Sequence, residues 1–300
     1  MLWKHSSLLL ITILLCLFPI NHSANILCMF TSCVQQNLIV FMAVANTLID
    51  KGHNVTIVTT IPIPTQVAPK SNFRHVYLEN PIEKIRKLKA VHIISYNETA
   101  PSTDASTNFF IASHMLTYMQ KDALQQKEFQ EFFHEDNSFD LMIMGYYYND
   151  FMVGIGARYQ CPIAIVSLCA PFSTLSRWIG NPSTTSYVQE AFFGKSQPMS
   201  FIERYQNFFI NAIEPLAQMY TEFVMGSIYR TLFTDESYPP YSDVISNISL
   251  VLYNRHFSEM PVRPLVPALV EIGGIQDEDQ SEYLPQVSFS SMKYQQICYS

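Results

Sequence analysis

Few residues of this chain combine a suitable side chain with a suitable position for acid–base chemistry. A histidine oriented by a carboxylate can deprotonate a hydroxyl near neutral pH, so histidines and acids next to predicted strands are the first candidates. His114 falls within a predicted amphipathic helix, where we expect a packed or surface side chain. His53 follows Gly52 and is expected in a turn. Asp150 follows a predicted buried strand, and we interpret it as a helix N-cap or a first-turn acid that complements the helix dipole.

Signatures of other chemistries are weak or missing. The stretch Gly154-Ile155-Gly156 lacks the third glycine and the preceding strand of a dinucleotide-binding fingerprint. The sequence has no P-loop, no HExxH and no GxSxG. Its cysteine spacings match neither a zinc site nor a CxxC redox pair. We therefore predict no metal site and no cofactor bound by this chain.

Aromatic side chains give a stronger signal. The sequence has 21 Phe and 17 Tyr against 9 Gly, which suits a protein that packs large side chains around an apolar cavity, although ordinary core packing gives the same composition and is the interpretation we favour. Several rings follow predicted strands and helices, where the ligand crevice of an α/β sheet would lie. Apolar pockets with few polar groups suit small lipophilic molecules. We predict that such a pocket is lined by Tyr146, Tyr147, Tyr148, Phe172, Trp178 and Phe201, and the alternative for each ring is a place in the core.

Composition and charge exclude some classes of function. At 48% hydrophobic residues, 300 residues can bury a substantial core in one large domain or two small ones. The 25 Asp and Glu outnumber the 18 Lys and Arg. Such a chain offers no basic surface to neutralise phosphates, so we predict no nucleic-acid partner.

The first residues have the order of a signal peptide. Lys4 and His5 precede a mainly apolar run at residues 8–18 and a polar segment at residues 21–24. That run is too short to span a bilayer comfortably, and no later segment has the roughly 18 uninterrupted apolar residues of a transmembrane helix. We predict a signal peptide over residues 1–24, no membrane anchor in this sequence, and a mature chain in the endoplasmic reticulum lumen or outside the cell.

Three sequons agree with that compartment. They place potential glycosylation acceptors at Asn54, Asn97 and Asn247. Asn97 lies in a polar stretch and is the best candidate, whereas Asn54 begins an apolar strand and is expected to be too buried. The sequence has six cysteines, and Cys16 lies in the predicted signal peptide, so the mature chain keeps five, an odd number. We expect these five to be mostly buried apolar residues.

Hydrophobic periodicity predicts alternating strands and helices. Predicted strands lie at residues 25–30, 55–59, 73–78, 139–144, 162–168, 250–253 and 268–272, and predicted helices at residues 38–49, 109–133, 151–159 and 199–229. Gly52 stands where a left-handed C-cap residue is needed after the first helix. Strand, helix and strand in close succession imply parallel pairing. We predict a doubly wound, mainly parallel α/β sheet with ligands at the carboxyl ends of its strands.

Several short motifs carry a family resemblance. The segment at residues 252–257, Leu-Tyr-Asn-Arg-His-Phe, resembles the end of the acceptor domain of UDP-glycosyltransferases, as do Arg-Pro-Leu-Val-Pro at 263–267 and Glu-Ile-Gly-Gly-Ile at 271–275. Other motifs resemble the insect branch of that family: Gly52-His53-Asn54-Val55-Thr56, Gly180-Asn181-Pro182 leading to Ser186-Tyr187, and Phe201-Ile202-Glu203-Arg204. In this order they extend the resemblance from Asn25 to about Ile275.

The resemblance implies a two-domain glycosyltransferase of the GT-B type, in which a Rossmann-like acceptor domain precedes a nucleotide-sugar domain. Residues 25–275 would be the acceptor domain. The family's donor signature, a stretch with Trp and Gln that ends in His-Gly-Gly, has no counterpart in these 300 residues. We expect residues 276–300 to be a divergent or truncated tail, the C-terminal donor domain to be absent, and the UDP-sugar to bind outside this chain.

The resemblance also implies a histidine base at the start of the first helix and a carboxylate just after the strand at residues 139–144. Counting back sixteen residues from His53, the interval of the family pattern, leads to Asn37, and an amide cannot act as a base near pH 7. The carboxylate position aligns with Gly145, and the nearest following acid is Asp150. We expect this chain alone to be inactive.

Two functions from different classes follow. In the first, an intact UDP-glycosyltransferase transfers a hexosyl or glucuronosyl group to a small lipophilic acceptor, and this chain supplies acceptor binding. In the second, the chain is a non-catalytic lumenal binder of apolar small molecules, or a regulatory partner of full-length family members.

Overall fold

The computed structural model describes residues 23–32, 35–63, 71–81, 105–169, 173–182, 184–188, 198–256, 258 and 263–277 of the chain. The predictions for the signal peptide, for Asn97, for Phe172 and for the tail after residue 277 lie outside these residues.

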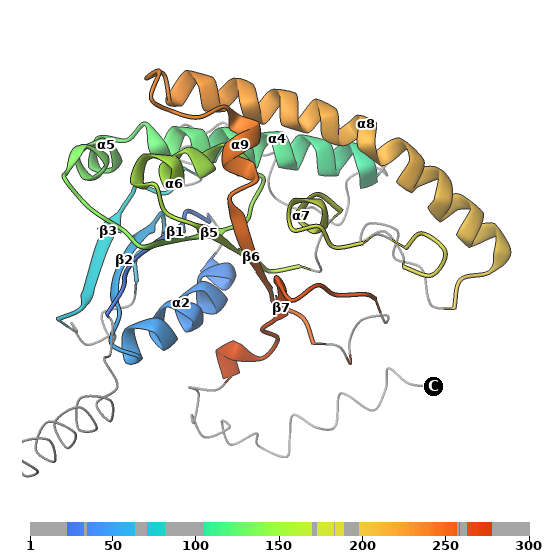
Figure 1. The fold of residues 1–300 in the computed structure, drawn as a ribbon, viewed down its shortest axis with the longest axis horizontal. Helices are drawn as coiled ribbons and strands as arrows, with labels where there is room; N and C mark the ends of the chain where they lie inside the picture. The colour runs from blue at the N-terminus through green and yellow to red at the C-terminus, as the bar shows by residue number, and fades with distance from the viewer. Residues whose placement is uncertain are drawn as a thin grey trace, which may run out of the picture.

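A seven-stranded parallel sheet forms the centre of the described structure, with the strand order β3-β2-β1-β4-β5-β6-β7 (Figure 1). The strands are β1 (Asn25–Phe30), β2 (Asn54–Thr59), β3 (Phe73–Tyr77), β4 (Leu141–Gly145), β5 (Ile163–Ser167), β6 (Ile248–Tyr253) and β7 (Leu269–Glu271). The central strands are nearly continuous apolar runs, as expected where helices cover both faces. The order reverses between β1 and β4, so the predicted doubly wound α/β fold is confirmed.

Helices cover the two faces unequally (Figure 1). One face carries α2 (Gln35–Asp50) and, near the end of the described chain, η2 (Ile275–Asp277). The other face carries α4 (Ala105–Leu124), α5 (Lys127–His134), η1 (Asp150–Met152), α6 (Val153–Tyr159), α7 (Ser173–Trp178), α8 (Phe201–Leu232) and α9 (Tyr241–Ile245). Each face encloses its own cluster of buried apolar side chains.

Local sequence explains where the best-defined helices begin and end. Gly52 has a φ of 88°, and the hydrogen bonds from Gly52 N to Ile49 O (3.0 Å) and from His53 N to Leu48 O (3.2 Å) form a Schellman motif that ends α2. The predicted left-handed cap is thus confirmed. At the start of α8, Ser200 and Glu203 form a capping box.

The predicted single helix at residues 109–133 is wrong, because two helices, α4 and α5, meet there. Gln126 between them has an extended backbone, with φ −67° and ψ 147°. Its side chain accepts a hydrogen bond from Glu79 N (2.7 Å) and donates one to Glu79 O (2.8 Å). This contact with the segment that follows β3 holds the break in place.

The expected burial of Asn54 is also wrong. Asn54 is exposed, and its amide donates a hydrogen bond to Asn25 Oδ1 (2.9 Å). It is the first residue of β2, at the amino-terminal edge of the sheet, and burial of that strand begins at Val55. The cysteines are divided: Cys28 and Cys161 are buried, as expected, but Cys169 is exposed.

None of the helices in the described part of the chain is long and apolar enough to cross a membrane.

Candidate functional site at the β1/β4 switch point

The carboxyl ends of β1 and β4 meet where the strand order reverses, which is the usual ligand position in open α/β sheets. Thr31 and Ser32 follow β1, and Asn37 lies in the first turn of α2. The Asn37 amide donates a hydrogen bond to Ser32 Oγ (3.0 Å), and Thr60 Oγ1 donates to Ser32 O (2.8 Å). The position where the resemblance implies a histidine therefore holds an amide bonded to a hydroxyl, and neither group is a base near pH 7.

Gly145 at the end of β4 lies directly under the ring of Phe41. A Cβ atom on residue 145 would approach Phe41 Cζ to 2.7 Å. The Phe41 ring is buried and stacks on Phe30, with 4.8 Å between the ring centroids. The position where the resemblance implies a carboxylate thus has no room for a side chain unless Phe41 moves.

Asp150, the nearest following acid, faces the other side of the sheet. It is 1% exposed, and the Tyr146 hydroxyl donates a hydrogen bond to its carboxyl group. The charge of Glu222 on α8 acts on it, and burial, followed by the charge of Asp150, raises the pKa of Tyr241 at the start of α9. Asn37 belongs to α2 on the opposite face. Asn37, at the position implied for the base, and Asp150, the acid nearest the position implied for the carboxylate, therefore have different partners on different faces of the sheet.

Burial is the main cause of an unusual pKa at Asp150. It raises the pKa from the ordinary 3.8 to about 7, and the hydrogen bond from Tyr146 only partly opposes it. Oδ1 of Asp150 is buried without a hydrogen-bond partner among the described residues. Asp150 is the first residue of η1, which agrees with its expected first-turn position, whereas the N-cap position belongs to Asn149.

The turn after β4 sends successive side chains to opposite faces. Asn149 fixes this turn, because its Oδ1 accepts a hydrogen bond from Tyr147 N (2.8 Å) and its Nδ2 donates one to Gly145 O (2.9 Å). Tyr148 has a φ of 53°, a left-handed conformation that non-glycine residues seldom adopt. Backbone strain of this kind is concentrated at functional sites.

Three of the predicted pocket rings gather on the α8 side of the sheet. Tyr146 lies 5.8 Å from Tyr148 and 5.9 Å from Trp178 of α7, measured between ring centroids. Tyr146 is buried, and the other two rings are half-buried. We call Tyr146, Tyr148 and Trp178 the ring cluster.

The other predicted pocket residues are placed elsewhere. Tyr147 lies on the α2 side, 6.2 Å from Phe41 between ring centroids. Phe201 is 81% exposed at the start of α8, and Phe172 lies outside the described residues. The alternation of side chains along an extended segment separates Tyr147 from its two neighbours.

Neutral polar residues that sequence reasoning missed close this edge of the sheet. Gln120 of α4 is 1% exposed and accepts a hydrogen bond from Thr31 Oγ1. Thr117, one turn earlier, donates to Tyr148 O (2.9 Å). Thr31 could have been predicted from the sequence, since it follows a buried strand directly. Gln120 and Thr117 could not, because only the packing of α4 brings them to this edge of the sheet.

Of the two histidines considered from sequence, one is exposed and the other bonds to the backbone. His114 is exposed on α4, and its ring centroid lies 6.3 Å from that of Tyr220. His53 Nδ1 accepts a hydrogen bond from Ala24 N (3.2 Å), in agreement with its predicted place in a turn. Among the described residues, no group of three His, Cys, Asp or Glu side chains could hold a metal ion.

A cavity of about 330 Å³ lies at the opposite edge of the sheet. Its aromatic walls are Phe129 and Phe133 of α5 together with Phe233 and Tyr238 after α8. In the chain, α5 precedes β4, α6 with the lining residue Arg158 precedes β5, and the segment after α8 precedes β6. The cavity therefore faces the amino ends of the strands. It is separate from the switch-point site.

Comparison with known proteins decides the family. The chain matches the family described as "UDP-glucoronosyl and UDP-glucosyl transferase" over residues 18–291. It belongs to the UDP-glycosyltransferase family.

Two similar relatives of this chain come from Dactylopius coccus. UDP-glucosyltransferase 2 is 27% identical over 276 residues, which cover 89% of this chain and 50% of the relative. UDP-glycosyltransferase UGT4 is 25% identical over 234 residues, which cover 75% of this chain and 43% of the relative. The chain thus spans about half the length of the curated relatives that it matches.

Solved structures similar to this chain include the calicheamicin glycosyltransferase CalG4, with a TM-score of 0.41 and 14% identity over 84% of this chain and 53% of that chain. A UDP-glucosyltransferase from Polygonum tinctorium, described as capable of glucosylating indoxyl, gives a TM-score of 0.40 and 9% identity over 90% of this chain and 55% of that chain.

Proposed function

We propose that this chain supplies acceptor binding for the transfer of a hexosyl or glucuronosyl group from a UDP-sugar to a small lipophilic molecule. Family membership supports the reaction class. The observation that carries the acceptor assignment is the ring cluster, because its three aromatic side chains follow β4 and β5 at the edge where such sheets bind ligands.

The polar groups around the cluster suit recognition of a hydroxyl better than its deprotonation. Thr31, Thr117 and Gln120 are neutral and already hydrogen-bonded within the protein. Asn37, at the start of α2, is an amide. We therefore propose that the base, if one is used, comes from outside these residues, and that the UDP-sugar is held by another part of a GT-B arrangement. We place the protein in the lumen of the secretory pathway, as the predicted signal peptide suggests.

Fluorescence can test acceptor binding directly. The chain has 2 Trp, and one of them, Trp178, belongs to the ring cluster. Titration with 1-naphthol should quench Trp178 in a saturable way. The substitution Tyr148→Asn keeps a residue that tolerates the left-handed backbone and removes one ring. It should weaken the affinity about two- to thirteenfold, the effect of losing an aromatic contact worth about 0.5–1.5 kcal/mol.

Tyr77→Asn is the matched control, because Tyr77 is 46% exposed on β3 and lies outside the cluster. It should leave the affinity unchanged. Quenching that does not saturate, or that responds equally to both substitutions, would contradict the acceptor assignment.

A second function is favoured by the overlap of Phe41 with the space above Gly145. If no carboxylate can stand there and no histidine stands at position 37, the chain is suited to binding without catalysis. It would then act as a lumenal binder of apolar small molecules or as a regulatory partner of full-length family members. Co-expression with a full-length relative separates these roles, since a partner changes that relative's turnover whereas a simple binder only competes for acceptor.

A further inference from the structure

The helix α8 is amphipathic with its polar side turned inward. Asn207 and Gln218 are buried against the protein, although both are polar. The opposite side of the same helix carries large apolar side chains that are between 45% and 81% exposed. We call them the outer arc: Phe201, Ile202, Tyr205, Phe208, Phe209, Ile213, Leu216, Met219, Tyr220 and Phe223.

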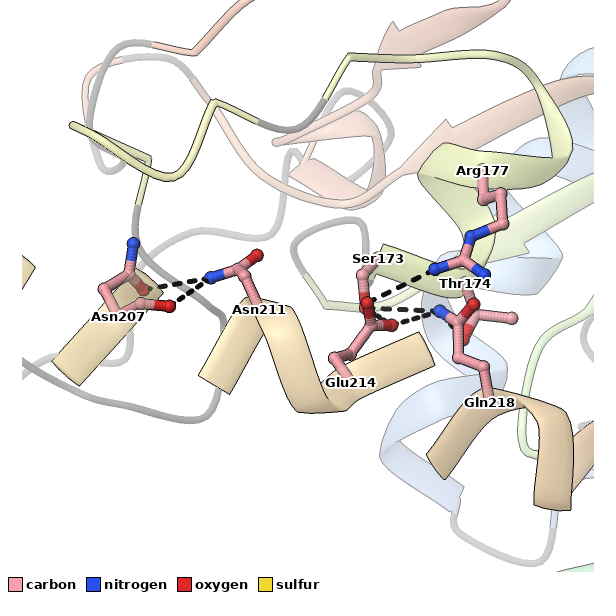
Figure 2. A network of polar contacts seen from close by, with 7 residues as sticks. All are labelled: Ser173, Thr174, Arg177, Asn207, Asn211, Glu214 and Gln218. Carbon is pink, nitrogen blue, oxygen red and sulfur yellow. Dashed lines mark hydrogen bonds and ion pairs between the residues drawn. The ribbon is translucent and has the colours of Figure 1, made fainter. Parts of the chain in front are cut away.

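Specific polar contacts hold α8 in this rotation, and Figure 2 shows those with α7. Glu214 accepts hydrogen bonds from Ser173 Oγ (2.5 Å) and from the Arg177 guanidinium (3.3 Å). Gln218 Nε2 donates to Thr174 Oγ1 (3.1 Å). These bonds would break if the helix rolled about its axis to bury the outer arc.

The first half of α8 is fixed in the same way. Asn207 Nδ2 donates to the backbone oxygens of Thr185 (2.7 Å) and Val188 (2.8 Å), and Asn211 bonds back to Asn207 (Figure 2). A buried amide without partners is unfavourable, so the inward polar side is selected by these acceptors.

The outer arc is long, wide and uncharged. At 1.5 Å per residue it extends about 33 Å from Phe201 to Phe223, and at 100° per residue it spans about 140° of the helix surface. The charged residues of this stretch, Glu203, Arg204, Glu214 and Glu222, all fall outside it. Side chains of this size expose on the order of 1,000 Å² together, more than the roughly 300–600 Å² of the largest apolar patch on a typical monomer.

The position of α8 favours a lipid surface over a second copy of this chain. Figure 1 shows α8 as the outermost layer of the molecule, arched outward, with its N-terminal half extending beyond the sheet. Pro215 lies inside the helix and accounts for the bend, since it removes a backbone hydrogen-bond donor. Two convex helices of this kind would touch near their centres and leave Phe201 and Phe223 in water, whereas a lipid surface adapts to the whole arc.

We propose that the outer arc binds the surface of a phospholipid bilayer, with α8 lying in the plane of the interface. Amphipathic helices bury such faces about 5–10 Å into the boundary between headgroups and acyl chains. Tyr118 of α4, 72% exposed, is next to α8 because its neighbour His114 contacts Tyr220, and tyrosine is favoured at this depth. The lack of charge in the arc points to zwitterionic lipid. The proposal does not depend on the proposed function.

The direct test uses the full chain with phosphatidylcholine vesicles and a reporter at position 209. In the variant Phe209→Trp, addition of vesicles should shift the added emission to shorter wavelength, and brominated phosphatidylcholine should quench it. A reporter at Tyr77→Trp, on the exposed edge strand β3, should show neither effect. If the Phe209→Trp reporter keeps its aqueous emission and escapes quenching by the brominated lipid, the proposal is overturned.

Substitution of the arc gives an independent measurement. The triple variant Phe209→Gln, Leu216→Gln and Phe223→Gln should reduce co-flotation with vesicles at least tenfold, at 0.1 M and 0.5 M NaCl alike. The matched triple variant Tyr77→Gln, Leu265→Gln and Val270→Gln removes exposed apolar side chains elsewhere and should float like the parent. A parent that forms dimers without lipid, which the arc variant converts to monomers, would show instead that a second copy covers the arc.

Discussion

The ring of Phe41 occupies the space that a side chain on residue 145 would need. A Cβ atom there would lie 2.7 Å from Phe41 Cζ, closer than carbon atoms pack without displacement. Asn37 lies one turn before Phe41 on the same helix, so α2 carries both features that depart from the implied catalytic pair. Where the resemblance implies a histidine and a carboxylate, this face of α2 presents the amide of Asn37 and the stacked ring of Phe41.

The contact between Gly145 and Phe41 predicts a coupled pair of substitutions. Gly145→Ala should lower the free energy of unfolding by about 1–3 kcal/mol, as overpacking of a buried site does. In a Phe41→Ala background the same substitution should have almost no effect, although Phe41→Ala itself costs about 3–5 kcal/mol. Urea denaturation of the four proteins of the cycle measures the coupling.

Gly226→Ala provides the control for that cycle. The nearest atom to a Cβ at residue 226 is Tyr241 Cδ1 at 3.4 Å, an ordinary contact, and Gly226 lies inside α8. This substitution should be neutral or stabilise the protein by about 0.5–1 kcal/mol, because alanine favours helix. If Gly145→Ala and Gly226→Ala lowered the free energy of unfolding equally, the contact with Phe41 would not be the cause of the loss at residue 145.

The buried carboxyl of Asp150 predicts a stability that falls as pH rises. Its pKa is raised from 3.8 to about 7 on folding, so the folded state binds a proton that the unfolded state releases between about pH 4 and pH 7. The contribution is complete at low pH and is lost as pH rises through 7. Between pH 5.5 and pH 8.5 the parent should lose about 2 kcal/mol that Asp150→Asn does not lose.

Thermal or urea unfolding at the two pH values measures this difference. Asp243→Asn, at an exposed carboxyl on α9, is the control and should follow the parent profile. A parent and an Asp150→Asn variant with parallel pH profiles would mean that Asp150 is ionised in the folded protein at neutral pH.

The break between α4 and α5 predicts an effect specific to Gln126. Gln126→Ala removes both hydrogen bonds to the Glu79 backbone and should destabilise the protein by about 1–2 kcal/mol. Gln125→Ala, one residue earlier at an exposed turn position, changes the same side chain and should be neutral within about 0.5 kcal/mol. Chemical denaturation distinguishes the two, and equal effects would assign the break to local sequence.

Local patterns were sufficient for the sheet. Val55 and Ile57 belong to a β-branched run that is buried on both faces, and Gly52 marks the turn before it, so both elements and their parallel pairing could be predicted. The break at Gln126 could not be predicted, because glutamine is a good helix former and its partner Glu79 is distant in sequence.

The candidate site was predicted only in part, for related reasons. Sequence placed Tyr146, Tyr147 and Tyr148 at the correct edge, but the turn held by Asn149 decides that Tyr147 faces α2. The periodicity of α8 shows an amphipathic helix without saying which side faces inward. That choice depends on acceptors such as Thr185 O.

The amide at position 37 predicts how transfer responds to a restored histidine. A chimera joins this chain to the C-terminal half of a full-length relative, and we compare it with and without Asn37→His. General base catalysis contributes about 10²–10⁴ in rate, and a histidine at residue 37 would lack an orienting carboxylate because Gly145 has no side chain. We therefore expect a gain of about 10²-fold in hexosyl transfer from labelled UDP-sugar to a phenol.

The same chimera with Asn37→Gln serves as the control, since a longer amide changes size without adding a base, and it should stay at the parent rate.

Asp150→Asn should leave the gain from histidine intact, because Asp150 faces the α8 side of the sheet whereas Asn37 bonds to Ser32 on the α2 side. If Asp150→Asn abolished the gain, the two residues would have to meet in the assembled enzyme. If histidine gave no gain while 1-naphthol still bound, residue 37 would not be the base position, and acceptor binding by the ring cluster would stand independently of it.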